Sequence, residues 1–342
     1  MPSPAVSVII PTYNRRVWVL RALQSVMDQI RPDDEVLVAD DGSTDETGQA
    51  IEALYGGRIR YYRLPHGGAG IARNRAIQLT TRPLVAFLDS DDEWMPGKLA
   101  LQRALMERCP EVIFCFSDFA VREQSGTEAH HFLVRWRDDP RPWSEILGPG
   151  IPYSTLADLP AGAADFPVHV GSLYLAEMEQ NHVLTSSAMV RREPAGEALR
   201  FAEDLRVSED KECFARLAAV GPAAYLDTET VWQSGHRGPR LTDAGSIELA
   251  SARLTLLHRI WEQDAAFVER FGTRLQRAIR LQHLLRARCY LARGMMQQAR
   301  YDLAQVPDCP LTYRLLGVLP GVIMRGGLAL RRWIRNQRAT AD

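Results

Sequence analysis

Short apolar runs alternate with amphipathic stretches over the first hundred residues. Residues 6–10, 35–39 and 84–88 are apolar runs of strand length, which is typical of strands buried on both faces of a sheet. Residues 58–64 alternate and predict a strand nearer the edge. Residues 17–27 have apolar side chains at helical spacing. This order predicts right-handed βαβ units and a mostly parallel sheet flanked by helices.

Two further helices are expected between these strands. Ser43 and Glu46 have the spacing of a capping box, so one helix should begin there. The glycine-rich residues 67–70 should open the other, which contains Arg73 and Asn74. The glycines do not match a Walker loop, since no Gly-Lys-Ser/Thr follows them.

The pattern changes near residue 120. Prolines and glycines interrupt residues 120–182, which predicts a long, loop-rich insertion. Strand character returns at residues 183–190, and a helix with Ser208 as its N-cap is expected next. A last pair of strands is expected at residues 224–226 and 231–232.

Residues 245–308 have apolar side chains at helical spacing and should form helices. We therefore expect an α/β domain over residues 1–243, made of halves 1–118 and 119–243, and a helical C-terminal region over residues 244–342.

Polar residues follow three of the predicted strands. They are Thr12 to Asn14, Asp40 to Asp45, and the group Asp89, Asp91 and Asp92. Ligands of such sheets bind outside the carboxyl ends of the strands, so the three clusters should meet at one edge. Taken singly, each could be a turn, a helix-terminal carboxylate or a solvated acidic loop. Their convergence favours a site.

The crowded carboxylates after residue 88 have their own chemistry. They would repel each other and raise each other's pKa unless a cation lies among them. Oxygen ligands of this kind suit Mg²⁺ or Mn²⁺ that also holds a phosphorylated ligand.

Composition adds little beyond these motifs. A formal net charge of −1 gives no argument for nucleic acid as a partner. The five cysteines form no C-x-x-C pair, so neither a zinc site nor a disulfide framework is indicated. The N-terminus lacks a signal segment and no run reaches the roughly 18 apolar residues of a membrane span, so a cytoplasmic place is expected.

Four motifs in this order resemble the family 2 glycosyltransferases. They are Val8-Ile9-Ile10-Pro11-Thr12-Tyr13-Asn14, Val38-Ala39-Asp40-Asp41-Gly42-Ser43-Thr44-Asp45, Ala72-Arg73-Asn74 and Phe87-Leu88-Asp89-Ser90-Asp91-Asp92. The similarity is dense over residues 5–120 and resumes at residues 183–243. It implies a GT-A (Rossmann-like) fold, a nucleotide-diphosphate-sugar donor, a divalent metal (Mn²⁺ or Mg²⁺) and inversion at the anomeric carbon.

The resemblance also implies roles for single residues on the donor side. Thr12 and Tyr13 would contact the nucleoside, Asp40 the uracil edge and Arg73 the nucleotide side of the pocket. Asp89 would reach the ribose, and Asp91 would hold the metal on the diphosphate. The candidate nucleotide-binding residues are Pro11, Thr12, Tyr13, Asn14, Asp40, Asp41, Arg73, Asp89 and Ser90.

The resemblance makes residues 1–118 the nucleotide-sugar half and residues 119–243 the acceptor half, and the catalytic candidates lie in the acceptor half. Glu209-Asp210, followed by an apolar helix, looks like the acidic pair of this family, with Asp210 as general base and Glu209 orienting the acceptor. The alternative is that both acids only stabilise the helix dipole. By the same resemblance His236 is a candidate second metal ligand, the alternative being a surface-loop histidine.

Two segments suggest binding partners. The aromatics Trp136, Trp143 and Tyr153 could stack on sugar faces of an acceptor or pack the insertion onto the core. Residues 311–338 are apolar and then rich in arginine. They could lie on an anionic membrane surface or form a docked C-terminal helix with a solvated end.

The sequence thus predicts a cytoplasmic, metal-dependent, inverting glycosyltransferase of the hexosyltransferase type. It would move a sugar from a UDP-sugar to a saccharide or lipid-linked acceptor, in assembly of a cell-surface polysaccharide. A sugar nucleotidyltransferase of similar fold and a catalytically inactive sugar-nucleotide-binding protein are the alternatives. The motifs do not specify the donor sugar, the linkage or the oligomeric state.

Overall fold

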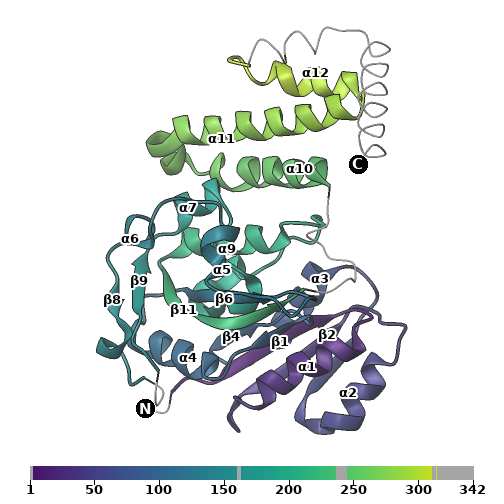
Figure 1. The fold of residues 1–342 in the computed structure, drawn as a ribbon, viewed down its shortest axis with the longest axis vertical. Helices are drawn as coiled ribbons and strands as arrows, with labels where there is room; N and C mark the ends of the chain where they lie inside the picture. Colours follow the sequence, from purple (N-terminus) through teal and green to yellow (C-terminus); the bar gives the residue numbers. More distant parts are fainter. Residues whose placement is uncertain (1–2, 160–162, 236–244, 310–312, 314–342) are drawn as a thin grey trace. The chain divides into compact units, whose positions relative to one another are not determined.

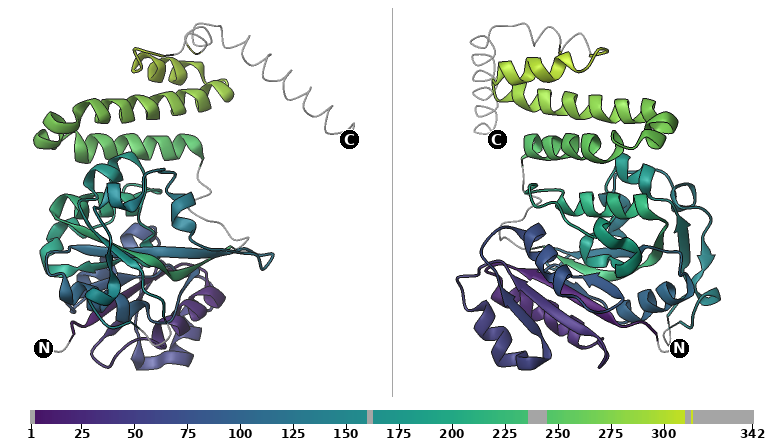
Figure 2. Two further views of the ribbon diagram at one scale, coloured as in Figure 1. Left: turned by 60° about the vertical axis from the view of Figure 1, so that its left-hand side comes forward. Right: turned by 180° about the vertical axis from the view of Figure 1, so that it is seen from behind.

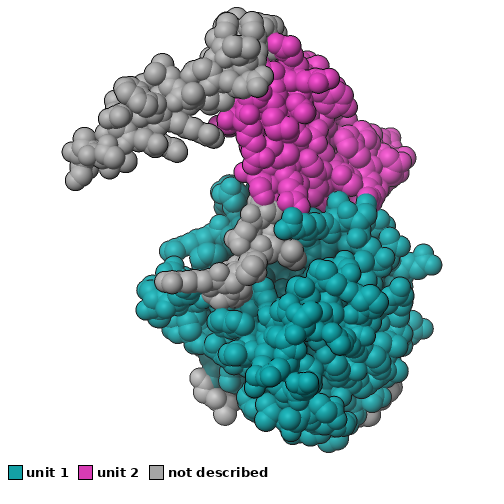
Figure 3. Space-filling model, turned by 90° about the vertical axis from the view of Figure 1, so that its right-hand side faces the viewer, with its two compact units in different colours: residues 1–238 teal, residues 239–342 magenta. Residues whose placement is uncertain are grey.

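The computed structural model describes residues 3–159, 163–235, 245–309 and 313 (Figure 1). The chain forms two compact units, unit 1 (residues 1–238) and unit 2 (residues 239–342) (Figure 3). The predicted boundary after residue 243 and the candidate ligand His236 lie outside the described residues, as do all but one of residues 311–338.

Unit 1 is built on one mixed sheet (Figures 1 and 2). The strands of its first half are parallel, and the strands of its second half add antiparallel pairs. The spatial order of the strands is β3 (Arg60–Arg63), β2 (Glu35–Asp40), β1 (Val6–Thr12), β4 (Leu84–Phe87), β10 (Met189–Arg191), β6 (Phe114–Arg122), β11 (Ala223–Ser234), β9 (Pro167–Gly171) and β8 (Ile151–Pro152). Two short strands lie off this path: β5 (Asp92–Trp94) pairs with β11 and β7 (Glu128–Ala129) with β6.

The apolar runs of the sequence form the buried strands of the sheet. All seven residues of β1 and all four of β4 are buried, as expected for strands covered on both faces. β3 lies at the end of the sheet, which confirms the edge position that its alternating sequence predicted. Because β1 and β2 are parallel with Thr12 opposite Asp40, their polar continuations leave the sheet at one edge.

Helices lie on both sides of this sheet, with α1 and α2 on one side and α9 on the other (Figure 1). The main helices of unit 1 are α1 (Arg16–Met27), α2 (Thr47–Tyr55), α3 (Ala69–Leu79), α4 (Lys98–Arg108) and α9 (Glu209–Val220). Shorter helices are α5 (Phe132–Trp136), α6 (Trp143–Ile146), α7 (Tyr174–Glu179) and α8 (Arg192–Ala195).

Two strand predictions in the second half are wrong. Residues 183–188 are not a strand, because a 3₁₀ turn (Thr185–Ser187) directs hydroxyl groups toward the acids of the strand edge, and β10 begins only at Met189. The expected pair at 224–226 and 231–232 is one strand, β11, with register irregularities around Glu229. The irregularities fall between residues 226 and 231, where the strand pattern of the sequence is interrupted.

The insertion and the helix starts also differ in part. Residues 120–182 are not a plain loop, since the end of β6, strands β7 to β9 and helices α5 to α7 lie within them. Ser208 immediately precedes α9 but its hydroxyl does not cap it, because the residue has a positive φ of 63°. Helix α2 begins at Thr47, close to the predicted start. No side chain caps it as the expected capping box would, and the backbone N–H of Thr47 donates to the carboxylate of Asp45.

Unit 2 is helical, as predicted, with α10 (Ser246–Leu256), α11 (Ala265–Ala292) and α12 (Met296–Ala304). Asp264 caps α11 by accepting the backbone N–H of Phe267 at 3.0 Å. Buried Asp302 of α12 accepts hydrogen bonds from Arg286 of α11, which joins these two helices. Within the described residues, no helix combines the length and the apolar composition needed to cross a membrane.

A buried ion pair fixes the start of the sheet against α4. Arg103 donates to both oxygens of Asp34 at 2.9 and 2.7 Å and to the carbonyl of Pro4 at 2.8 Å. Asp34 also accepts the N–H of Val6, the first residue of β1. Both side chains are nearly inaccessible, at 2% and 0% exposure.

We predict that Arg103→Met destabilises unit 1 strongly, because Asp34 would remain buried without its cation. Breaking one partner of a buried pair costs about 3–5 kcal/mol in the free energy of unfolding. Urea denaturation followed by tryptophan fluorescence measures this change. Exposed Arg108 at the end of the same helix is the matched control, and Arg108→Met should change stability by less than about 0.5 kcal/mol. Equal effects of the two substitutions would refute the role of the pair.

Candidate functional site

The loops after β1 and β2 are held together by Asn14. This residue has a positive φ of 49°, a conformation that asparagine tolerates better than most residues. Its side-chain oxygen accepts the backbone N–H groups of Thr44 and Asp45 at 2.7 and 3.2 Å. Its own N–H donates to the Ser43 hydroxyl at 2.8 Å. The first two predicted polar clusters therefore form one structure.

Asp40, the last residue of β2, lies beneath the loop that follows it. It is fully buried and accepts the N–H of Ser43 at 2.7 Å and the hydroxyl of Tyr61. Burial, strengthened by Asp40, raises the pKa of Tyr61, so the phenol stays a donor. Beside Asp40, the hydroxyl of Thr12 is buried without a hydrogen-bond partner in the protein. A ligand that reached this hydroxyl would supply the partner that it lacks.

Asp41 organises the next loop. It accepts the N–H groups of Gly67 and Gly68 at 2.7 and 2.9 Å and lies 2.9 Å from the Nδ1 atom of His66. The His66 ring stacks on Tyr13 with 4.3 Å between ring centroids. Since Tyr13 is 41% exposed, this pair offers an accessible aromatic surface at the strand edge.

Arg73 of α3 connects the two halves of unit 1. Its guanidinium donates to Asp89 at 2.6 Å and to Glu209 at 2.9 Å, although the two acids are far apart in sequence. The side chain is only 5% exposed and lies over the ring of Phe201 at 4.9 Å. Arg73 thus brings a predicted donor residue and a predicted catalytic residue together.

A close approach of backbones makes this bridge possible. A β-carbon on Gly70 of α3 would lie 2.6 Å from the carbonyl oxygen of Ala202 and 3.3 Å from the Cγ atom of Glu209. Only glycine fits there without movement of the chain. The glycine-rich start of α3 therefore serves packing against the segment before α9.

The three aspartates after β4 have different partners. Asp89 binds Arg73, and Asp91 forms an ion pair with Arg15. Asp92 is buried and accepts the Ser186 hydroxyl at 2.5 Å, while Ser186 also accepts the N–H of Asp89 at 3.1 Å. Asp92 therefore points into the protein, whereas both acids of the D-x-D pair face arginines. Ser90 between them is buried.

Glu209 and Asp210 begin α9 next to this acid group. Burial raises the pKa of both carboxyls, and for Glu209 the neighbouring charge of Asp210 adds to it while Arg73 opposes it. Asp210 remains partly accessible and accepts the Thr185 hydroxyl at 3.3 Å. A carboxyl with a raised pKa and partial access to solvent has the properties of a general base.

Asp91 is the residue at this edge that would hold a divalent cation shared with a ligand. No group of three or more histidine, cysteine or acidic side chains in the described residues is spaced to enclose a metal. Mg²⁺ in particular needs only one or two carboxylates when phosphates and water complete its shell. Asp91 offers such a carboxylate, and its pairing with Arg15 indicates that a positive charge is favoured there.

Several residues of the site carried no signal in the sequence. Arg15, Tyr61, His66, Thr185, Ser186 and Phe201 contact the predicted site residues from loops or neighbouring strands, and their spacing follows no motif that we recognised. Of the three candidate acceptor aromatics, Tyr153 is buried and hydrogen-bonded to the carbonyl of Leu101. Trp143 stacks on Tyr225 at 4.0 Å and is 6% exposed, which favours packing over an open stacking surface.

Known glycosyltransferases resemble parts of this chain. A teichuronic acid biosynthesis glycosyltransferase of Bacillus subtilis, a putative one by its name, is 38% identical over 134 residues, 38% of this chain and 52% of the relative. An Escherichia coli UDP-Glc:alpha-D-GlcNAc-diphosphoundecaprenol beta-1,3-glucosyltransferase is 33% identical over 119 residues, 34% of this chain and 47% of the relative. The chain therefore matches only about half the length of these relatives.

The fold also matches solved structures. A structure of S. aureus TarS residues 1–349 in complex with UDP-GlcNAc has a TM-score of 0.59 at 17% identity, and the match covers 88% of this chain and 81% of that TarS fragment. A Pyrobaculum calidifontis mannosyltransferase with GDP-Man and Mn²⁺ has a TM-score of 0.52 at 20% identity, covering 96% of this chain and 83% of that one. These likenesses confirm the predicted fold class. Since the model of glycosyl transferase family 2 also matches residues 7–177, half of the sequence, this chain belongs to that family.

Proposed function

We propose that the protein is a metal-dependent, inverting hexosyltransferase that takes its sugar from UDP-sugar. The acceptor is a saccharide or a lipid-linked saccharide, and the setting is assembly of a cell-surface polysaccharide. Support comes from the names of the relatives, which include teichuronic acid biosynthesis and a diphosphoundecaprenol-linked acceptor. The solved complexes of the same fold with UDP-GlcNAc and with GDP-Man and Mn²⁺ support a nucleotide sugar and a metal.

One observation carries this proposal: Arg73 donates hydrogen bonds to both Asp89 and Glu209. It brings the carboxyl end of β4, where the donor is expected, next to the start of α9, where a base is available. In a single displacement the acceptor hydroxyl attacks the anomeric carbon while one base takes its proton. We assign this proton transfer to Asp210, and the orientation of the acceptor to Glu209, which Arg73 holds in place.

The other residues act by binding. The Tyr13–His66 pair offers a face for the nucleobase, and the unpaired Thr12 hydroxyl beside Asp40 offers a hydrogen-bond donor. Asp91 would hold a divalent ion, which when bound supplies positive charge to the leaving diphosphate. A stabilised leaving group needs no acid, which is consistent with one base here where glycoside hydrolases use two carboxyl groups.

The two alternatives are disfavoured by specific features. A sugar nucleotidyltransferase needs a basic, glycine-rich triphosphate loop near the first strand, and residues 11–14 hold none. A binding-only protein would have no need for the acid pair that begins α9, whose ionised forms are disfavoured in the folded state. A place at the inner face of the cytoplasmic membrane, through residues 311–338, is part of the proposal and rests on the sequence alone.

The metal assignment predicts that Asp91→Asn abolishes the Mn²⁺-dependent part of UDP binding. The amide keeps the shape of the side chain but removes the charge that would hold the ion. Calorimetric titration of UDP with Mn²⁺ and with a chelator measures the effect. Asp33→Asn, at an exposed acid, should bind UDP like the unaltered protein. UDP affinity in Asp91→Asn that still responds to Mn²⁺ would refute the assignment.

The base assignment predicts that Asp210→Asn keeps UDP binding but loses transfer by on the order of 10²-fold or more, the usual contribution of a general base. Transfer by the unaltered enzyme should decline as the pH falls toward the raised pKa of this carboxyl. Release of UDP from UDP-glucose or UDP-GlcNAc in the presence of an acceptor measures turnover. Asp204→Asn, at an exposed acid outside the helix, is the matched control.

The same variant should be at least as thermally stable as the unaltered protein above neutral pH. Because the folded-state pKa of Asp210 is raised, ionisation of this group removes stability as the pH rises, and asparagine avoids that loss. Lower turnover with a lower melting temperature would therefore indicate damage to the fold.

Near-normal turnover in Asp210→Asn with an inactive Glu209→Gln would assign the base to Glu209, and activity in both would exclude α9 from the chemistry.

A further inference from the structure

One pocket of unit 1 shares no residue with the strand-edge site. It is an open pocket of about 730 Å³, within the size range of ligand sites. Its wall comes from α5, the loop that joins α5 to α6, the start of α6, and single residues of β9 and β11. Three arginines, three aspartates and Trp143 lie in this wall.

Two side chains in this wall have buried N–H groups without a partner. Arg137 donates from Nη2 to the carbonyl of Arg141 at 2.6 Å, but its Nε and Nη1 atoms are buried and form no hydrogen bond. The Nε1 atom of Trp143, over whose ring Arg137 lies at 4.4 Å, is also buried and unpaired. Arg137 is 4% exposed and Trp143 6%. Leaving buried donors unpaired is costly, so a ligand or water that accepts from them would be favoured.

The aspartates of the wall do not pair with these N–H groups. Asp139 accepts hydrogen bonds from Arg141 at 2.6 and 2.9 Å and lies 3.2 Å from the Nε2 atom of His182. Asp227 accepts the hydroxyl of Tyr225 at 2.9 Å. Burial lowers the pKa of Arg137, an indication that its charge is only partly compensated. The groups left for a ligand here include the N–H donors of Arg137 and Trp143, with the exposed carboxylate of Asp138 as an acceptor in the same wall.

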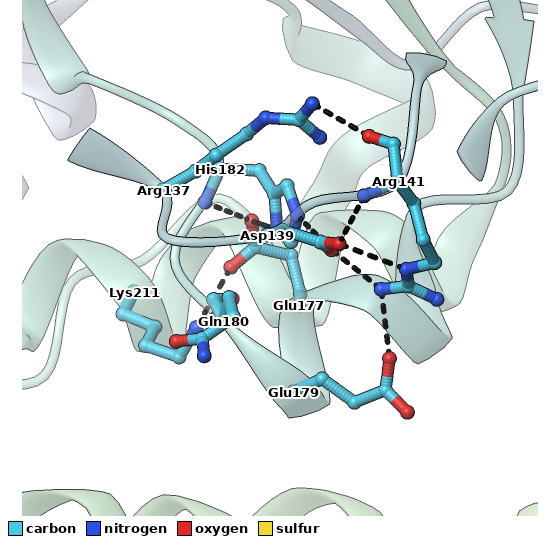
Figure 4. A network of polar contacts seen from close by, with 8 residues as sticks. All are labelled: Arg137, Asp139, Arg141, Glu177, Glu179, Gln180, His182 and Lys211. Atoms are coloured by element: carbon cyan, nitrogen blue, oxygen red, sulfur yellow. Dashed lines mark hydrogen bonds and ion pairs between the residues drawn. The ribbon is translucent and has the colours of Figure 1, made fainter. Parts of the chain in front are cut away.

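Buried polar contacts connect this wall with α9 (Figure 4). The imidazole Nε2 atom of His182 contacts Asp139, and the backbone N–H of His182 donates to Glu177 at 2.9 Å. Glu177 in turn pairs with the ammonium group of Lys211 at 3.2 Å. Lys211 also donates to the carbonyl of Gln180. Glu177 and His182 are fully buried and Lys211 is 2% exposed. Since the backbone N–H of Lys211 donates to Asp210 at 2.7 Å, the pocket wall and the candidate base belong to one polar network.

We propose that this pocket binds the acidic group of an anionic saccharide, a carboxylate or a phosphate, through Arg137 and the indole N–H of Trp143. An oxyanion supplies the acceptors that these donors lack, and charge-assisted hydrogen bonds of arginine with such groups are among the strongest. The inference rests on the proposed function, since it makes the saccharide part of the acceptor. The network through Glu177 and Lys211 would hold that acidic group in a fixed relation to Asp210.

The test compares three probes that differ only in the charged group, D-glucuronate, glucose 6-phosphate and neutral glucose. Each is added at equal concentration to the full chain with UDP present, and the shift in melting temperature is measured. We expect one or both acidic sugars to stabilise the protein more than glucose does. Glucuronate alone would identify a carboxylate site, and glucose 6-phosphate alone a phosphate site.

Three variants test the residues. Arg137→Gln removes the cation and should weaken binding of the acidic sugar about tenfold or more, the scale of one lost charged hydrogen bond. Ser144→Glu places a carboxylate on an exposed wall position and should weaken it as well, even if Arg137→Gln proves unstable. Arg108→Gln, at an exposed arginine outside the pocket, should bind normally.

The proposal is overturned if glucose stabilises the protein as much as both acidic sugars do. It is also overturned if the acidic-sugar effect survives in Ser144→Glu or in a folded Arg137→Gln. UDP binding to the same variants separates this result from the donor proposal. Variants that bind UDP normally but lose the acidic sugar support the pocket, whereas an unaltered protein that fails to bind UDP contradicts the proposed function itself.

Discussion

The buried guanidinium of Arg73 is the interaction on which the strand-edge site depends. A cation at 5% exposure is tolerated only if acids compensate it, and Asp89 and Glu209 do so from opposite halves of unit 1. Removing either acid would leave a buried charge with half its partners. The geometry of β4, α3 and α9 is therefore coupled through one side chain, and Gly70 makes that coupling possible by allowing α3 to approach the segment before α9.

Charge balance around Arg73 explains the character of the neighbouring acids. Asp89, Glu209 and Asp210 act electrostatically on one arginine, so the group has more negative than positive charge, and burial raises the pKa of the two acids of α9. A diphosphate brought to the same edge would add further negative charge. This excess of negative charge is the electrostatic basis for our proposal that a divalent ion accompanies the nucleotide.

Sequence reasoning was most successful where the backbone pattern alone decides the structure. The apolar runs of β1, β2 and β4 and their polar ends located the strand edge, because parallel strands bring such ends together. It could not find Arg15, His66 or Ser186, since their roles come from loop paths that no periodicity encodes. The prediction of a strand at residues 183–188 failed for the same reason. Its serine and threonine hydroxyls serve the acids of the site rather than a ladder of strand hydrogen bonds.

The second half of unit 1 shows how far a composition argument can mislead. Prolines and glycines in residues 120–182 suggested an irregular insertion, yet this segment contains buried charges such as Asp139 and Glu177 that must satisfy one another. Such a network is stable only when nearly every member is paired, yet several buried atoms here have no hydrogen-bond partner: the free N–H groups of Arg137 and Trp143, the Nδ1 atom of His182 and the side-chain oxygen of Asn181. Of these residues, Arg137 and Trp143 line the pocket, so a ligand bound there would supply the acceptors that their N–H groups lack.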